Sequence, residues 1–338
     1  MKIAVDAFGG DNAPLCVIDG CYQAMQLADD IEIVLFGDES KIKACAKENN
    51  IDISNMTIVH TDEIFDMHDE PKELIRAKRG TSLGMAFDAV AKGECDAIVS
   101  AGSTGAVLMG ATFIVKRIRG VKRAAIGTVL PTTGKPYLLI DSGANINVRP
   151  EALLQFAMLG TAYMKNVLKI ENPTVGLLNN GAEDSKGGET LVEAYQLLKN
   201  SSLNFVGNIE AREVPKGACD VLVADGFAGN VVLKLTEGLA SSFLSMFKEV
   251  FFKNIFTKLA ALILKPGLKG LKKKLDYSEY GGAPFLGVKK PVIKTHGSAN
   301  AKAIKFAVMQ ANDFAKSNFE ETVSKFMNDN KAENKEEE

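Results

Sequence analysis

Residues 97–105 read Ala-Ile-Val-Ser-Ala-Gly-Ser-Thr-Gly, a short aliphatic run that ends in a turn of small and polar residues. The same pattern recurs along the chain, with aliphatic runs at residues 3–6, 31–36, 137–140, 175–178, 221–224 and 292–295. Near-continuous apolar runs are typical of parallel strands that helices cover on both faces. Helical periodicity follows several of the turns, which is the pattern of βαβ units. The sequence therefore predicts an α/β fold built on a parallel sheet.

The predicted helices and the segments between them suggest how the chain is organised. Helical periodicity covers residues 13–28, 103–118, 150–168, 186–199 and 299–327. Residues 238–275 predict an inserted helical hairpin, because they are helix-rich and no strand pattern interrupts them. Residues 328–338 contain almost no apolar side chains and end in three glutamates, so we expect a disordered acidic tail. We predict a single catalytic unit over residues 1–327, which includes the hairpin.

The hairpin combines apolar and basic segments. Six apolar residues, Leu259–Leu264, precede Lys265-Pro266-Gly267, which predicts an apolar tip closed by a Pro-Gly turn. A second, basic helix would follow, with Lys269, Lys272, Lys273 and Lys274. We expect the apolar faces to pair with a second subunit and the tip to touch an anionic membrane, through Leu259, Leu262, Ile263 and Leu264. The alternative is a dimer bundle alone, with the lysines in solvent.

Bulk properties exclude several classes of protein. The 338 residues are 46% hydrophobic and carry a formal net charge of −2, without an arginine-rich stripe, which argues against a nucleic-acid partner. Five cysteines form no C-x-x-C pair, so we expect neither a disulfide framework nor a zinc or other metal site. The N-terminus reads as a strand and not as a signal peptide. No apolar run approaches the roughly 18–20 residues that cross a bilayer, so we expect a cytoplasmic protein.

The glycine-rich turns predict an anion site. Ligands of open α/β sheets bind beyond the carboxyl ends of the strands. A helix that starts there offers unpaired amides and a positive dipole end, and glycine lets the backbone approach a phosphate closely. Any one turn is equally well explained as a structural connection, so the prediction rests on their number. No G-x-G-x-x-G follows the first strand and no G-x-x-x-x-G-K-[ST] occurs, so nucleotide fingerprints are absent.

Two titratable side chains follow predicted strands. Lys186 lies at a predicted helix start, where a lysine opposes the helix dipole, so an anion in front of it would account for its position. The alternative is a solvated surface lysine. His296 ends a strand, and the pKa range of histidine suits proton transfer, although a lone histidine is often structural. Cys95 and Cys219 begin strand-like runs at the wrong edge of the sheet, which disfavours a covalent thiol mechanism.

Eight motifs spread along the chain are more specific together than any is alone. They are Asp6-Ala7-Phe8-Gly9-Gly10-Asp11, Ala101-Gly102-Ser103-Thr104-Gly105-Ala106, Asp141-Ser142-Gly143-Ala144-Asn145, Lys186-Gly187, Phe205–Arg212, Asp225–Asn230, Tyr280–Pro284 and His296–Asn300. In combination they resemble the bacterial phosphate acyltransferase family, the acyl-[acyl carrier protein]:phosphate transacylases. Phe8, Ser103 and Ala299 depart from the usual Met, Asn and Ser of that family.

The resemblance implies a fold and a reaction. The fold would be a Rossmann-like α/β/α sandwich of the isocitrate and isopropylmalate dehydrogenase type, with two lobes around a cleft and the helical hairpin inserted. The protein would be a homodimer, peripherally attached to the membrane, and would need no cofactor. It would transfer an acyl group from acyl carrier protein to inorganic phosphate. The acyl phosphate would enter phospholipid synthesis, with a membrane glycerol-phosphate acyltransferase as a further partner.

Direct attack by phosphate on a thioester needs no enzyme nucleophile, because the thioester is already activated. Holding two reactants together contributes roughly 7–11 kcal/mol, and one oxyanion donor contributes about 3–4 kcal/mol. We expect Lys186 to bind phosphate, and Asn180, Asn230 or His296 to support the oxyanion or protonate the leaving thiolate. The other predicted phosphate-site residues are Gly102, Ser103, Thr104, Gly105, Asn145, Asp6, Gly9 and Gly10.

Two rival functions are open at this point. An NAD-dependent decarboxylating dehydrogenase is compatible with the implied fold, since fold does not fix function. It would need an arginine cluster for a hydroxyacid and a carboxylate cage for a metal, and no obvious arginine cluster lies at a strand end. A non-catalytic scaffold at a membrane surface is the second rival, and the many polar turns outside residues 238–275 argue against it.

Overall fold

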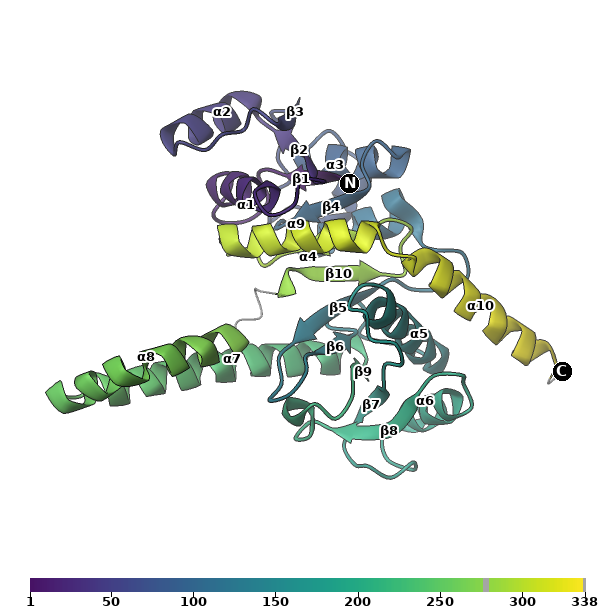
Figure 1. Cartoon of the computed structure of the whole chain (residues 1–338). Helices are drawn as coiled ribbons and strands as arrows, with labels where there is room; N and C mark the ends of the chain where they lie inside the picture. Colours follow the sequence, from purple (N-terminus) through teal and green to yellow (C-terminus); the bar gives the residue numbers. More distant parts are fainter. Residues whose placement is uncertain (276–279, 337–338) are drawn as a thin grey trace.

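A computed structural model describes residues 1–275 and 280–336. Its centre is an eleven-stranded sheet with the order β3-β2-β1-β4-β11-β10-β5-β6-β9-β7-β8 (Figure 1). The strands are β1 Lys2–Asp6, β2 Glu32–Gly37, β3 Met56–His60, β4 Ala97–Ser100, β5 Ala125–Leu130, β6 Tyr137–Ile140, β7 Val175–Asn179, β8 Phe205–Glu210, β9 Val221–Val223, β10 Ala283–Leu286 and β11 Val292–Lys294. The prediction of an α/β fold is therefore confirmed.

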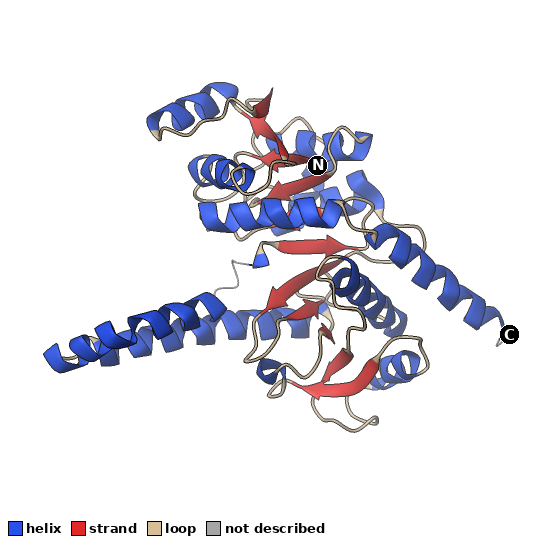
Figure 2. Cartoon of the chain, viewed as in Figure 1, coloured by secondary structure: helices blue, strands red, loops and turns tan. Residues whose placement is uncertain are grey.

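Helices surround the sheet, and one pair projects from it (Figure 2). The α-helices are α1 Leu15–Met25, α2 Glu39–Glu48, α3 Ser82–Lys92, α4 Thr104–Met109, α5 Pro150–Asn166, α6 Glu189–Lys199, α7 Gly226–Phe251, α8 Ile255–Leu275, α9 Ala301–Ala315 and α10 Phe319–Glu336. Short 3₁₀ turns are η1 Pro71–Ile75 and η3 Val214–Lys216, and α4 continues into a π-helical segment, η2 Gly110–Lys116. The predicted helix over 103–118 is thus two helical segments of different winding.

The sheet is mixed, so the prediction of one parallel sheet was wrong for the molecule as a whole. Strands β3, β2, β1, β4 and β11 run parallel, and so do β6, β9, β7 and β8. Between these two groups, β10 is antiparallel to both β11 and β5, and β5 is antiparallel to β6. The second group therefore runs opposite to the first. The sequence pattern missed β5, β8 and β10, because none of them is followed by the turn and α-helix that mark a βαβ unit.

The core has two layers in the first lobe, which comprises β1–β4, β11 and their helices. Alternate residues of a strand point to opposite faces, so Ile3 and Val5 join one apolar cluster while Ala4 joins the other. Helices α1 and α9 cover the first face, and α3, α4 and η2 cover the second. The first cluster continues under α5 and α6 of the second lobe, which comprises β6–β9. One continuous core therefore holds the two lobes together.

Helices α7 and α8 form the predicted hairpin and extend well beyond the body of the molecule (Figure 1). Their connection lies at residues 252–254, so the predicted turn at Lys265-Pro266-Gly267 was wrong: Pro266 lies inside α8. The apolar run Leu259–Leu264 is consequently a helical segment near the outer end of the hairpin. The side chains of Lys272, Lys273 and Lys274 lie outside the described part of the structure. In the described residues, no helix combines the length and apolarity that crossing a bilayer requires.

The C-terminal region differs from its prediction in two ways. The single helix predicted over 299–327 is divided into α9 and α10, where Phe314 and Phe319 pack edge to face at 4.9 Å. Helix α10 also continues to Glu336, into the segment predicted to be disordered. Residues 320–336 contain neither glycine nor proline, and the buried Phe319, Val323 and Met327 anchor the first turns of this helix. The predicted tail at 337–338 lies outside the described residues.

The first turns of α7 pack against the backbone that follows β6. The Gly226 amide donates to the Asn145 carbonyl at 2.7 Å. A Cβ at Gly229 would lie 1.9 Å from the carbonyl oxygen of Asp141, which is far inside van der Waals contact. The close approach of helix and turn therefore requires glycine at position 229.

We predict that Gly229→Ala lowers the free energy of unfolding by about 1–3 kcal/mol, because the methyl group forces α7 away from the Asp141 turn. Gly238→Ala in the same helix is the matched control, since a Cβ there meets nothing within 4 Å. That control should gain roughly 0.5–1 kcal/mol from helix propensity. Urea unfolding of both variants measures the difference, and equal stabilities would show that α7 does not pack as described.

Candidate active site

A cavity of about 470 Å³ lies where turns of the two lobes meet. The first lobe contributes the turns after β1, β4 and β11 to its wall, and the second contributes the turn after β6 and the start of α7. Residues from both lobes line it: Asp11, Gly102, Thr104, Lys294, Thr295, His296 and Gly297 from the first, and Ser142, Gly143, Asn230, Leu233, Lys234 and Glu237 from the second. Turns rich in backbone amides, together with both acidic and basic side chains, therefore line the same cavity.

A second cavity of about 470 Å³ lies elsewhere in the first lobe, between α3 and strands β2 and β3. Val34, Phe36, Val59 and Met85 contribute apolar surface to it. None of the turns that follow β1, β4, β6 or β11 lines this second cavity. The cavity between the lobes is therefore the candidate active site, because the predicted anion-binding turns meet there.

Asp6 organises the first-lobe wall from beneath. Its carboxylate accepts hydrogen bonds from the Ser82 and Ser100 hydroxyls at 2.7 and 2.8 Å. Ser100 Oγ in turn accepts from the Gly102 amide at 3.0 Å. Burial raises the pKa of Asp6, and the serine hydrogen bonds oppose that shift. Asp6 does not line the cavity, so its contacts hold the turns after β1 and β4 in place.

Two glycines let the first-lobe turns approach each other. A Cβ on Gly9 would lie 2.5 Å from Asp6 Oδ2, and one on Gly10 would lie 2.7 Å from the Gly297 carbonyl oxygen. Gly10 also has a φ of +94°, which favours glycine. The neighbouring Asp11 amide donates to the Gly297 carbonyl at 2.8 Å, which ties the turn after β1 to the turn after β11.

Asp141 holds the turn after β6 in the second lobe, as Asp6 holds the turns of the first lobe. Its carboxylate accepts from the amides of Gly143, Ala144 and Asn145 and from the amide of Ile126. Asn145 Nδ2 donates to the Ala124 carbonyl at 2.8 Å and to Asp141 Oδ2 at 2.9 Å. The amide groups of Asn145 are therefore already paired within the protein. Asn145 shapes the wall instead of facing the cavity.

The structure brings together four of the predicted site residues in the cavity wall: Gly102, Thr104, Asn230 and His296. Thr104 begins α4, and Asn230 lies beside Gly143 in the first turns of α7. His296 is exposed, and its Nδ1 lies 2.8 Å from the Ser298 hydroxyl. The other predicted residues do not line the cavity: Ser103, Gly105, Asn145, Asp6, Gly9, Gly10, Asn180 and Lys186.

Lys186 lies on an exposed loop between β7 and α6, and α6 begins only at Glu189, three residues later than predicted. The buried Asn179 shapes this loop by donating from Nδ2 to the Lys186 carbonyl at 3.0 Å. Asn180 is exposed on the same loop. Strands β6, β9 and β7 are parallel neighbours, so this loop leaves the sheet at the same edge as the turns that carry Gly143 and Asn230.

Lys294 is the buried charged residue of the cavity wall that the sequence analysis missed, and the ion pair of Lys234 and Glu237 was missed as well. It ends β11 and is only 8% exposed, and burial lowers the pKa of its ammonium group to about 8. Asp6 and Asp11 oppose that shift. The signal in the sequence is a lysine within Val292–Thr295, an otherwise buried run, where a charged side chain needs an explanation.

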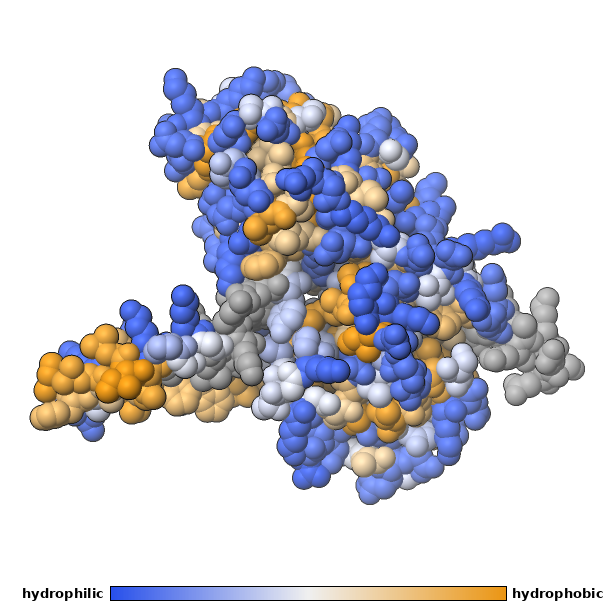
Figure 3. All heavy atoms as spheres, viewed as in Figure 1, coloured by the Kyte–Doolittle hydropathy of each residue, from blue (hydrophilic) through white to orange (hydrophobic). Residues whose placement is uncertain are grey.

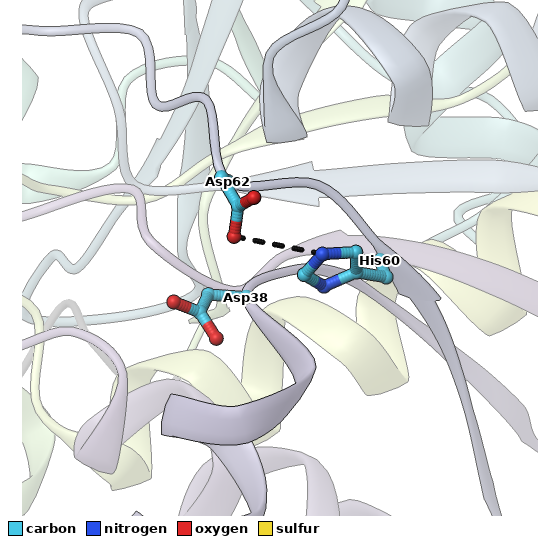
Figure 4. Close-up of side chains that lie close together, drawn as sticks. All are labelled: Asp38, His60 and Asp62. Atoms are coloured by element: carbon cyan, nitrogen blue, oxygen red, sulfur yellow. Dashed lines mark ion pairs between the residues drawn. The ribbon is translucent and has the colours of Figure 1, made fainter.

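One group of potential metal ligands lies outside the cavity (Figure 4). Asp38, His60 and Asp62 place one ligand atom each within 4.8 Å of the others. However, Asp38 accepts from the Lys41 amide at the start of α2, and His60 Nδ1 accepts from the Glu39 amide at 3.2 Å. His60 Nε2 faces Asp62 at 3.5 Å. These contacts explain the cluster as a helix start beside a surface contact between a histidine and a carboxylate.

Comparison with known proteins identifies the class. The chain matches the profile of the family described as "Fatty acid synthesis protein" over residues 1–322. A phosphotransacetylase from Streptococcus pyogenes has a similar fold, with a TM-score of 0.62 and 19% identity over 92% of this chain and 93% of that one. The protein therefore belongs to a family of fatty acid synthesis proteins and has an α/β fold similar to that of a phosphotransacetylase.

Curated relatives narrow the class further. Phosphate acyltransferase from Alkaliphilus oremlandii is 48% identical over 314 residues, which cover 93% of each chain. The phosphate acyltransferase of Bacillus licheniformis is 46% identical over 319 residues, covering 94% of this chain and 96% of that protein. The chain belongs to the phosphate acyltransferase family and is an acyltransferase. The resemblance predicted from the eight motifs is confirmed, and the dehydrogenase alternative is not favoured.

The buried ammonium of Lys294 predicts a pH dependence of stability. Its folded pKa of about 8 lies below the ordinary value of 10.5, so between these pH values the unfolded chain binds more protons than the folded chain. The contribution of Lys294 to the free energy of unfolding therefore rises with pH across that window, by at most about 3 kcal/mol. Urea unfolding of the wild type and of Lys294→Met at several pH values measures the effect. A difference between them that stays constant would show an ordinary, solvated lysine.

Proposed function

We propose that the protein transfers a fatty acyl group from acyl-[acyl carrier protein] to inorganic phosphate, giving acyl phosphate for phospholipid synthesis. The observation that carries the proposal is the convergence of Gly102, Thr104, His296 and Asn230 on one cavity between two lobes. We further assign the fold to the isocitrate and isopropylmalate dehydrogenase type, in which the cleft between lobes is the active site. Family membership supports an acyl transfer with phosphate as the acceptor.

The reaction is a direct displacement. A phosphate oxygen forms a bond to the thioester carbon, the C–S bond breaks, and the carrier thiolate leaves and takes up a proton. Thr104 holds the phosphate at the start of α4, where the first amides of a helix have no partner within it. Gly102, which has no side chain, leaves the adjoining wall open to the anion. Asn230 or His296 supports the carbonyl oxygen as it gains charge, and the proton for the leaving sulfur comes from His296, because an asparagine amide cannot act as an acid. Proximity of two bound reactants supplies the largest part of the rate.

Lys186 and Asn180 act from the rim in this proposal. Their loop follows β7, a neighbour of β9, and β9 leads directly into the α7 turn that carries Asn230. The apolar cluster under that edge contains Leu178 of β7 together with Ala228 and Leu233 of α7, so the two segments share one packing layer. A lysine on this loop can bring a positive charge to anionic substrates that enter the cavity.

The purified protein should release free carrier from acyl carrier protein only when inorganic phosphate is present, with acyl phosphate as the product. Lys186→Ala should lower this rate at least about 100-fold, as removal of one charge-stabilising donor does. Its fold should stay intact, because the side chain is exposed. Lys199→Ala, at the exposed last residue of α6, is the control and should leave the rate unchanged. Consumption of the thioester without phosphate would refute the function, and a fully active Lys186 variant would refute the role of that lysine.

The hairpin supplies the surface for the proposed dimer and membrane contact. Its apolar side chains are widely exposed, with Phe256 at 79% and Ile263 at 81%, and the outer end is mostly apolar in Figure 3. Exposed apolar patches of this kind mark interaction sites. We propose that one part of the hairpin pairs with the hairpin of a second copy, while Leu259, Leu262, Ile263 and Leu264 contact an anionic membrane. The protein would then be cytoplasmic and peripherally attached, close to a membrane glycerol-phosphate acyltransferase that consumes the acyl phosphate.

Liposome flotation tests the membrane contact. Replacing Leu262 and Ile263 with Glu should release the protein from vesicles that contain anionic lipid, because two charges then enter an apolar contact. A matched control replaces Leu27 and Ile64 with Glu, since these side chains are also exposed and lie away from the hairpin. The control should float like the wild type. Equal flotation of both double variants would exclude the tip as the attachment point.

A further inference from the structure

Lys294 places an ammonium group in the wall of the cavity. Its Nζ donates to two backbone carbonyls, that of Ala101 at 3.4 Å and that of Thr295. Ala101 directly precedes Gly102, and Thr295 directly precedes His296, so the ammonium lies between the two first-lobe turns that line the cavity. The side chain reaches this position from the end of a central strand, which fixes it far better than an exposed loop fixes a surface lysine.

No carboxylate among the described residues forms an ion pair with this ammonium. The carboxylate of the buried Asp6, which interacts electrostatically with Lys294, already accepts hydrogen bonds from Ser82 and Ser100. Lys234 and Glu237 also line the cavity, but they pair with each other at 2.8 Å. Asp11, in the turn after β1, is a further acid in the wall and opposes the lowering of the pKa of Lys294 from a distance. A buried ammonium that lacks a direct counter-ion is costly, and an anion in the cavity would offset that cost.

We propose that Lys294 is the ammonium group that contacts the inorganic phosphate in this cavity. The inference rests on the proposed function and adds a substrate-binding residue to it. A lysine ammonium has three N–H donors, and the two carbonyls leave the third for an oxygen of the phosphate. A charge-assisted bond in a partly dry site is strong, and it shortens as the negative charge of the acceptor grows. Gly102 and Thr104 lie in the same wall, next to Ala101, and leave room for the anion.

The competing explanation is that Lys294 only balances the buried charge of Asp6. Both explanations predict that Lys294→Met binds phosphate more weakly, so that variant alone does not distinguish between them. They differ in the double variant Asp6→Asn/Lys294→Met, in which both charges are gone, while residue 6 keeps its size and one of its two acceptor oxygens. If Lys294 is only a counter-charge, the double variant recovers wild-type phosphate binding. If Lys294 contacts phosphate, the defect in phosphate binding stays.

The experiment measures inorganic phosphate in two independent ways. In steady-state acyl transfer, Lys294→Met should raise the KM for phosphate at least about tenfold, as expected for loss of a charge-assisted bond. The KM for the acyl thioester should change less than about threefold. In thermal unfolding without thioester, phosphate should raise the Tm of the wild type by binding to the folded state, and this rise should be lost in both variants that lack Lys294. Methionine has a similar length and no charge, so the variant should fold.

Lys289→Met is the matched control, because Lys289 is exposed on the β10–β11 loop and lies outside the cavity. It should keep the wild-type KM for phosphate and the wild-type Tm rise. A wild-type phosphate KM in Lys294→Met, or recovery of that KM in the double variant, overturns the inference. Failure of the wild type to form acyl phosphate would instead refute the proposed function, and the phosphate-dependent Tm rise would still report on Lys294 separately.

Discussion

The reversal of strand direction across β10 and β5 determines where the turns that line the cavity lie. In an all-parallel sheet every strand would end at one edge, and the turns would form a single row along it. Here the two parallel groups run in opposite directions, so each lobe presents its own row of turns. The cavity forms where the rows meet, with Gly102 and His296 from one lobe and Gly143 and Asn230 from the other. A site for two substrates benefits from this arrangement, because each lobe can hold one of them.

Each row of turns is organised by one buried aspartate at a strand end. Asp6, the last residue of β1, organises its row through hydrogen bonds from Ser82 and Ser100. Asp141 accepts hydrogen bonds from the amides of the turn after β6. Buried carboxylates are stable only when they are fully hydrogen-bonded, so these residues use up donors that would otherwise face a ligand. A glycine-rich turn is therefore not automatically an anion site. The donors left for substrate are fewer than the number of turns suggests, and this gives the buried ammonium of Lys294 more weight.

Much of the architecture follows from local sequence patterns, and the remainder depends on distant contacts. The strands with apolar runs, the hairpin and the family motifs were all predictable, since each is encoded within a few consecutive residues. The reversal at β5 and β10 was not, because strand direction depends on which strands pair. Pro266 suggested a turn, yet α8 accommodates it, and α10 continues past the predicted helix end.

In the site, Asn230 and His296 were found through their motifs. Lys294, in contrast, looked like part of an ordinary strand. Asn145 was predicted to bind phosphate, but its donor groups are paired within the protein.

Helix α7 connects the cavity with the hairpin. Its first turns carry Asn230, Leu233, Lys234 and Glu237 in the cavity wall, and the same uninterrupted helix runs to Phe251 at the outer end. At about 1.5 Å per residue, its 26 residues extend for roughly 39 Å. Because Gly229 fits so closely against Asp141, the inner end of this helix has little freedom to move independently of the wall. Any partner that binds the exposed apolar face of the hairpin therefore fixes the orientation of the cavity relative to itself. In the proposed function the product is a reactive acyl phosphate, and a fixed distance between the cavity and the proposed membrane contact would shorten its path to the next reaction.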